Sequence, residues 1–314
     1  MPALRPIHKL ILATAVLFLM PFSILSFHFS SGNTEILRRE VLSRIEARAA
    51  GTARMAFEIL ETDYGAREVI TGRAFSSASM EERKAMLKKK NKERPNFYLG
   101  FSLLNSSGRE VASAGREKSD SPDYSRKGVF KRTMASAQSQ GAVEYRPDEP
   151  PVLLAAEPIR RPGEAKPSGV VVTRISLARL VELVRSERAG SDPGECGIVD
   201  AGGLVIADSR GEAVMNPGSS APAGIIRLIN AALARGVREM KAGVSSGKGR
   251  ADLVSVAAVP GTQWWVYERE PASVVKGYVS SRWARRVIIS GMLLILIFSL
   301  ITARLAVYWL VPRH

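Results

Sequence analysis

Two long apolar segments, one near each end, constrain the topology of this chain more than any other feature. Leu10–Phe27 contains no charged residue, and Val287–Ala303 is a second such run that continues past Arg304. Each run has the length of a helix that crosses about 30 Å of hydrocarbon at about 1.5 Å per residue. The sequence therefore predicts transmembrane helices at residues 10–29 and 287–309. A cleaved signal peptide is the alternative for the first run, because a basic flank precedes it.

Charge sets the predicted orientation of these spans. The chain has 45 Lys and Arg residues against 30 Asp and Glu residues, and all the acidic residues lie between Glu35 and Glu270. Basic residues in short flanks keep those flanks in the cytoplasm. We therefore expect a cytoplasmic N-terminus at residues 1–9 and a cytoplasmic stub at 310–314, with residues 30–286 on the other side of a plasma (inner) membrane, periplasmic or extracellular. Nucleic-acid binding is not expected for two reasons. The basic residues are interspersed with acidic residues, and they are predicted to lie outside the cytoplasm.

Catalytic and metal chemistry find little support. The only cysteine is Cys196, and the three histidines lie in or beside the terminal apolar segments. No disulfide, structural zinc site, metal or cofactor is therefore expected. Ser245 and Lys248 match the Ser-x-x-Lys pattern, which needs a helix start to bring both side chains to one face. A membrane-anchored Ser-Lys hydrolase is the alternative function, while a glycine- and serine-rich hairpin tip is the simpler interpretation.

Helices are predicted to fill residues 30–92. Apolar residues recur every three or four positions from Thr34 to Ile70, which is typical of a long amphipathic helix. Such a stalk needs a partner for its apolar stripe, either its own domain or the same helix of a second chain. Ser79 and Glu82 form a capping-box pattern that opens a second, basic helix, and Pro95 follows its end.

After Pro95 the pattern changes to strands. The predicted strands are Phe97–Leu104, Arg109–Ala114, Val143–Tyr145, Val152–Ile159 and Val170–Ile175. Helices are expected at Lys127–Ala137 and Leu177–Val184. Together these elements predict an antiparallel sheet with helices between its strands, in a PAS-like order.

This order repeats further along the chain. The hairpin Leu103–Ala112 has an echo in Ile198–Ala207, and both place an Asx residue at the turn with a glycine three positions later. Ala155–Pro158 has an echo in Ala257–Pro260, and Trp264–Glu270 is the closing strand of the second unit. Two matches in the same order predict a duplicated unit.

The region from about Thr34 to Ser281 resembles a double Cache domain, the extracytoplasmic sensor module of bacterial histidine kinases and chemoreceptors. The resemblance implies an α+β fold: two tandem PAS-like antiparallel sheets behind a long N-terminal helix, flanked by the two transmembrane helices. It places a membrane-distal unit at residues 93–188, a membrane-proximal unit at 189–272 and a connecting helix at 273–286.

In the resembling family the membrane-distal unit usually holds the ligand, lined by the segment that follows the first hairpin. Amino-acid-binding members carry Arg-x-Trp-Tyr there, whereas this chain has Lys127, Val129 and Phe130 at the matching positions. The resemblance therefore favours a small anion such as a carboxylate over a free α-amino acid. The corresponding stretch of the second unit, Asp208–Pro222, has no aromatic residue. The predicted ligand-binding residues are Asp123, Tyr124, Arg126, Lys127, Phe130, Tyr145 and Glu157.

The resemblance further implies a signal-transducing, non-enzymatic sensor. Few residues follow the second span, so the output module is expected to be absent or supplied by a separate membrane signalling protein. A truncated sensor histidine kinase or chemoreceptor is the alternative. The expected partners are a small-molecule ligand and a second copy of the chain, which would pair through the long helix and the spans.

Overall fold

The computed structural model describes residues 36, 38–61, 65–115, 123–146, 149–160, 164, 166–188, 194–211, 216, 218–245, 251–271, 289–291, 293–294 and 297. The chain divides into two compact units, Ile45–Arg269 and the paired ends Met1–Arg44 with Glu270–His314. The two predicted spans lie outside the described residues, apart from short pieces of the second. Within the part of the chain that is described, no helix combines the length and apolar character needed to cross a membrane.

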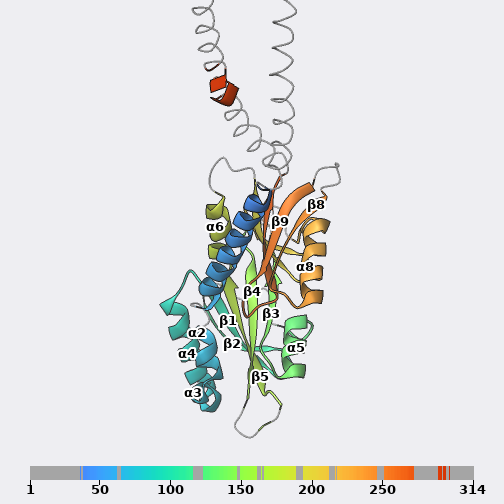
Figure 1. The fold of residues 1–314 in the computed structure, drawn as a ribbon. Coiled ribbons are helices and arrows are strands. Elements are labelled where there is room, and N and C mark those ends of the chain that lie inside the picture. The colour runs from blue at the N-terminus through green and yellow to red at the C-terminus, as the bar shows by residue number, and fades with distance from the viewer. Residues whose placement is uncertain are drawn as a thin grey trace, which may run out of the picture. The chain divides into compact units, whose positions relative to one another are not determined.

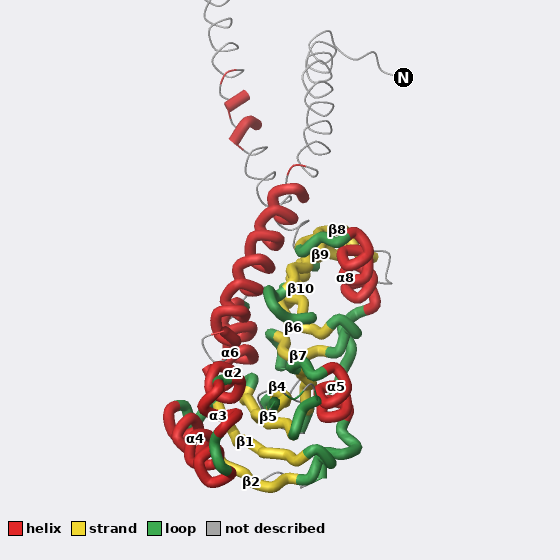
Figure 2. Tube along the Cα trace, turned by 90° about the horizontal axis from the view of Figure 1, so that it is seen from below, coloured by secondary structure: helices red, strands yellow, loops and turns green. Residues whose placement is uncertain are grey.

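Helices precede the first sheet. Residues 38–61 are helical, and α2 (Gly65–Thr71), α3 (Arg73–Ser77) and α4 (Met80–Glu93) follow. The predicted capping box of α4 is confirmed, because the Ser79 hydroxyl accepts from the Glu82 backbone N–H at 3.4 Å and the Glu82 carboxylate accepts from the Ser79 N–H at 2.7 Å. In Figure 2, α4 lies beside β1 (Tyr98–Asn105) and β2 (Glu110–Gly115) of the sheet described next, and α3 contacts both α2 and α4.

The first sheet unit contains five antiparallel strands in the spatial order β2-β1-β5-β4-β3. Helix α5 (Gly128–Ser136) lies between β2 and β3 in the chain and packs against β3 and β4 (Figure 1). The strands are β1 (Tyr98–Asn105), β2 (Glu110–Gly115), β3 (Gln140–Glu144), β4 (Val152–Ile159) and β5 (Gly169–Ser176).

The second sheet unit repeats this order as β7-β6-β10-β9-β8. Helix α6 (Ala178–Glu187) leads into it, and α8 (Ala223–Arg235) packs on β8 and β9, where α5 packs on β3 and β4 in the first unit (Figure 1). The predicted duplication of an α+β, PAS-like unit is confirmed. The strands are β6 (Glu195–Asp200), β7 (Val205–Asp208), β8 (Glu239–Ser245), β9 (Ala251–Ala258) and β10 (Trp264–Glu270).

The two predicted hairpin turns have the same geometry. The Asn105 carbonyl Oδ1 accepts backbone N–H groups from two and four residues later, at 3.1 and 3.0 Å, and Asp200 Oδ1 accepts the N–H of Leu204 at 2.8 Å. Gly108 and Gly203 have φ of +83° and +86°, a region that glycine enters without steric cost. The Asx-to-glycine spacing therefore encodes both turns.

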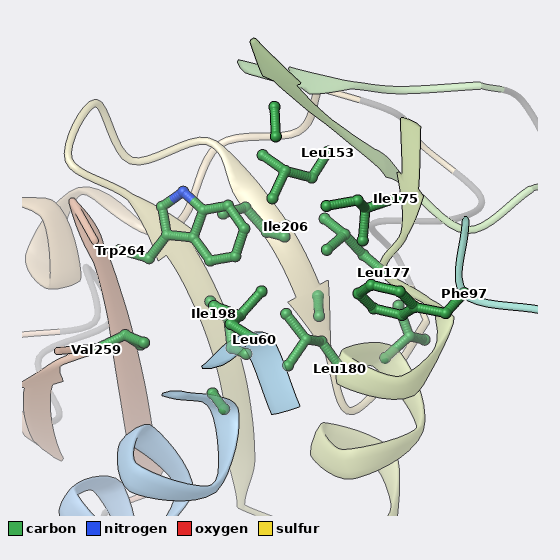
Figure 3. Packing of buried hydrophobic residues seen from close by; sticks show 14 of the residues in the cluster. Leu60, Phe97, Leu153, Ile175, Leu177, Leu180, Ile198, Ile206, Val259 and Trp264 are labelled. Atoms are coloured by element: carbon green, nitrogen blue, oxygen red, sulfur yellow. The ribbon is translucent and has the colours of Figure 1, made fainter. Parts of the chain in front are cut away.

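Each sheet buries both of its faces. One face of each contributes to a single apolar core that also receives the helix over residues 38–61, so Leu60, Leu153 and Trp264 lie in one cluster (Figure 3). The opposite face of each sheet packs under its own helix, α5 in the first unit and α8 in the second. Strands buried on both faces explain the near-continuous apolar runs of β4 and β5.

Candidate functional site

The aromatic residues of the predicted ligand segment pack as core beneath α5. Tyr124 is only 1% exposed, and Phe130 is buried beside it against Val172 of the sheet. The Tyr124 N–H donates to the Gly108 carbonyl at 2.8 Å, and a Cβ on Gly108 would lie only 2.7 Å from the Cα of Ser125. This close approach fixes the segment over the sheet, where the two aromatic rings fill space under the helix.

The charged residues of the same segment lie at its surface. Asp123 accepts the Ser125 N–H at 2.8 Å, and hydrogen bonds from the Ser125 side chain and backbone lower the pKa of its carboxyl. Arg126 is exposed. Lys127 lies 3.2 Å from a Glu144 carboxylate oxygen and 4.8 Å from the ring centre of Tyr124, so its charge already has a partner.

Tyr145 and Glu157 lie far from each other along the first sheet. Leu153, Ala155 and Ile159 lie an even number of residues from Glu157 along β4, so they share its face of the sheet. This face packs against the shared core rather than against α5. Glu144, beside Tyr145, pairs with Val152, which places Tyr145 about 20 Å from Glu157 along the strands at about 3.3 Å per residue. The structure thus places five of the seven predicted residues at the start of α5, with Tyr145 and Glu157 far from each other along the sheet; the role of all seven in binding stays a prediction.

Tyr145 has a distinct environment. Its side chain is half-buried, and its hydroxyl is buried with no hydrogen-bond partner among the described residues. Burial, followed by the nearby charge of Asp200, raises the pKa of Tyr145 to about 12. Tyr145 therefore lies near Asp200, in the hairpin of the second unit.

Glu157 lines a cleft of about 500 Å³. Helices α2 and α3 supply one side of this first-unit cleft, and the link from α5 to β3 and the end of β4 supply the other. Ala137 adopts the left-handed conformation (φ 53°) at the end of α5, which directs the following residues toward the cleft. The polar side chains along the cleft are Thr71, Ser76, Gln138, Ser139, Glu157 and Arg160.

Two opposite charges lie in the first-unit cleft. Glu157 is 3% exposed, and its carboxylate accepts the Ser139 hydroxyl. Arg160 is exposed and donates to the Ala137 carbonyl. A buried carboxylate with an arginine at the same opening can hold a small molecule that carries both an amine and a carboxylate. Sequence reasoning predicted Glu157 alone, because the helical wall comes from a segment far away in the chain.

The hydrolase alternative needs Ser245 at a helix start. The structure instead makes Ser245 the last residue of β8, paired with Ala251 of β9 across a hairpin, as the tip interpretation predicts. Lys248 lies outside the described residues. Among the residues that are described, no three His, Cys, Asp or Glu side chains are grouped as metal ligands.

Comparisons with known proteins identify the fold. No protein-family model and no curated protein sequence matches the chain. Three solved structures align with most of it. The ligand-binding domain of Mlp24 with asparagine is 16% identical (TM-score 0.53, 80% of this chain, 99% of that chain). The ligand-binding domain of the Pseudomonas fluorescens chemoreceptor CtaA with L-isoleucine is 14% identical (0.57, 78% and 98%). An extracellular domain assigned to a histidine kinase, rpHK1S-Z16, is 12% identical (0.59, 76% and 97%).

This chain has the fold of these sensor domains. The double Cache resemblance drawn from the two hairpins is thereby confirmed at the level of fold. The neighbours are sensor domains of chemoreceptors and histidine kinases rather than enzymes. Identities of this size carry no ligand or residue role from one chain to the other.

Proposed function

We propose that the chain is a membrane-anchored sensor whose two-sheet region lies outside the cytoplasm, binds a small molecule and passes a signal across the membrane. The observation that carries the proposal is the pair of sheets with identical strand order, a fold shared with sensor domains of chemoreceptors and histidine kinases. The terminal apolar segments support the anchoring. The output module is supplied by a partner protein, or by a longer kinase or chemoreceptor of which this chain is a part.

The proposed ligand site is the first-unit cleft. The buried Glu157 carboxylate can accept hydrogen bonds from an ammonium group. The exposed Arg160 guanidinium can donate two hydrogen bonds to a carboxylate. A ligand of amino-acid size suits a cleft of about 500 Å³. The ligands named for the neighbours, asparagine and isoleucine, belong to the same chemical class. This proposal departs from the expectation drawn from sequence, which favoured a small carboxylate over a free α-amino acid.

Thermal unfolding of the full chain in mild detergent tests the assignment. A ligand at a hundredfold excess over its dissociation constant stabilises the folded state by about 2.7 kcal/mol. Among small zwitterions and carboxylates, we expect at least one to raise the melting temperature of the wild type. Glu157→Gln and Arg160→Ala each remove this shift, because each deletes one charged contact, while Arg126→Ala keeps it.

The site predicted from sequence includes both Arg126 and Glu157, so it predicts that Arg126→Ala also removes the shift. A shift that disappears in Arg126→Ala and survives in Glu157→Gln moves the site to the α5 side. If none of the compounds shifts the transition of a well-folded wild type, the amino-acid-sized ligand is wrong.

A further inference from the structure

Helix α4 has the densest group of lysines in the chain. Five of the 13 lysines lie at positions 84–92, although arginine is the commoner basic residue by 32 to 13. The three acidic residues of α4, Glu81, Glu82 and Glu93, lie at its two ends. Residues 83–92 between them therefore carry six basic side chains and no acidic one. The five lysines are Lys84, Lys88, Lys89, Lys90 and Lys92.

The packing of α4 does not require these lysines. The buried side chain of α4 is Leu87, which belongs to the shared apolar core. Lys84, Lys88 and Lys92 are all exposed and lie four residues apart. Residues with this spacing lie on one side of a helix, so the three form a row with charges about 6 Å apart along the axis. We call these three residues the lysine row.

The lysine row has no counter-charge within the described part of the chain, where none of its three side chains has a hydrogen bond or an ion pair. By contrast, the Lys90 ammonium lies 2.9 Å from a carboxylate oxygen of Glu93, and Glu82 is engaged in the capping box. Like charges four residues apart repel one another and oppose helix formation. The helix therefore retains a destabilising feature that its own packing does not explain.

The long helix over residues 38–61 has a different charge pattern. Arg54 and Glu58 are both exposed and lie four residues apart with opposite charges, a spacing that stabilises a helix. Glu46 of the same helix pairs with Lys241 of β8. Mixed signs of this kind leave little net field, whereas a row of one sign attracts ions of the other sign. The lysine row is therefore suited to a partner with several negative charges.

The composition of this side of α4 fits some classes of partner better than others. Protein interfaces bury aromatic anchors and are depleted of lysine at their centres, and sites for single-stranded nucleic acid add aromatic side chains on which bases stack. Residues 80–93 contain no aromatic residue. Arginine is the usual partner of a planar carboxylate, whereas lysine acts as a point charge that also suits phosphate and similar oxyanions.

We propose that the exposed side of α4 binds an anionic polysaccharide that carries sulfate or phosphate groups. The lysine row and Lys89 donate hydrogen bonds to successive anionic groups of the polymer. Helix α4 lies on the side of the first sheet away from the second sheet unit (Figures 1 and 2). Under the proposed function this side faces away from the membrane, where such polymers occur. No lining residue of the first-unit cleft belongs to α4, so the two sites are separate.

Binding of fluorescently labelled dextran sulfate to the full chain in an uncharged detergent tests the proposal. A contact with a single-stranded polyanion releases about 0.7 counter-ions, so four lysines predict binding that is about fiftyfold weaker at 200 mM than at 50 mM salt. Lys84→Gln/Lys88→Gln/Lys92→Gln should bind at least tenfold more weakly at the lower salt, and the salt effect should fall to about threefold. Uncharged dextran should not bind.

A matched control separates α4 from the overall positive charge of the chain. Arg126→Gln/Lys131→Gln/Arg132→Gln removes the same charge from exposed residues of and beside α5, and it should change the affinity less than twofold. Equal losses in the two triple variants would overturn the proposal. Absence of binding to dextran sulfate would overturn it too. At equal charge concentration, tighter binding of poly-L-glutamate or of duplex DNA would make the partner a protein or a nucleic acid instead.

The outcomes are also distinct from those of the proposed function. Glu157→Gln should leave the binding of dextran sulfate unchanged, and loss of polymer binding in that variant would contradict a separate site. Glutamine has nearly the helix propensity of lysine, so the triple variant of α4 should fold, and circular dichroism checks this. Lys88→Glu, a single change at the centre of the lysine row, should also weaken the binding and decides the question if the triple variant is unfolded.

Discussion

A buried ion pair joins the end of α6 to the last strand of the second unit. An Arg188 Nη2 atom lies 2.5 Å from Glu268 Oε2, and the two side chains are 3% and 1% exposed. A Cβ on Gly194 would lie 2.1 Å from the Arg188 guanidinium, so the chain closes tightly over the pair. Burial raises the pKa of Glu268, and the opposing charge of Arg188 offsets this only in part. The desolvation of the two charges therefore costs more free energy than their mutual attraction contributes.

This balance predicts an asymmetric set of variants. Glu268→Gln leaves Arg188 buried without its counter-ion and close to a second cation, Arg48, so we expect a loss of about 3–5 kcal/mol in unfolding free energy. Arg188→Met leaves Glu268 with Arg48 still nearby, so its cost should be smaller. The double variant Arg188→Met/Glu268→Leu removes both charges. Its free energy of unfolding should lie within about 1 kcal/mol of the wild-type value or exceed that value by about 1–4 kcal/mol.

Urea unfolding of the full chain in detergent, followed by tryptophan fluorescence, measures these free energies. A double-mutant cycle isolates the interaction between the two side chains. If the double variant loses much less unfolding free energy than the two single variants lose together, the two side chains pair directly. The surface pair Lys90 and Glu93 is the matched control, because exposed pairs contribute about 0–1 kcal/mol. The reasoning is refuted if Glu268→Gln costs less than about 1 kcal/mol, or if the double variant loses as much as the two single variants together.

Three further predictions follow from single features of the chain. Ser79→Ala removes the capping box of α4 and should cost about 1 kcal/mol in urea unfolding, whereas Ser79→Asp should retain most of it; equal stability of all three proteins would contradict the cap. Tyr145→Phe deletes a buried hydroxyl that has no hydrogen-bond partner among the described residues, so stability at pH 7 should stay equal or rise by up to about 1 kcal/mol. Because the folded pKa of Tyr145 is about 12 and its ordinary value is 10, the unfolded chain loses this proton first, and wild-type stability should fall from pH 10 to 12 more steeply than that of Tyr145→Phe in matched urea titrations. For topology, a cysteine at Ser119 should react with an impermeant maleimide in spheroplasts without lysis; labelling only after the inner membrane is permeabilised would place the sheets in the cytoplasm.

Local patterns were sufficient to predict most strands and both turns. Val152–Ile159 and Trp264–Glu270 are strands with the predicted bounds, because each is a short, mostly apolar run that ends at a turn signal. The Asx residues Asn105 and Asp200 located the hairpins, since their side chains bond to the turn backbone. Helix α8 is missing from the predicted elements, although Ile225, Leu228, Ile229 and Ala232 show helical spacing.

The sites were harder to predict, because they depend on contacts between distant segments. Tyr124 and Phe130 pack in a buried cluster beneath α5, and the sequence pattern alone does not show this packing. The first-unit cleft needs α2 and α3 to lie near the end of β4, and no spacing rule predicts such a contact. Asp208–Pro222 has no aromatic residue, whereas Tyr267 of β10, a strand distant in sequence, lines a cavity of the second unit together with this stretch.

The continuous core has a consequence for how a ligand in the first-unit cleft would act on the second unit. Leu153 beside Glu157 and Trp264 near Tyr267 belong to one buried cluster, which also receives Leu60 from the helix over residues 38–61 (Figure 3). Closely packed interiors transmit strain because their side chains have no free space to absorb it. A ligand that shifts β4 therefore acts on the same packed residues as one that shifts β10.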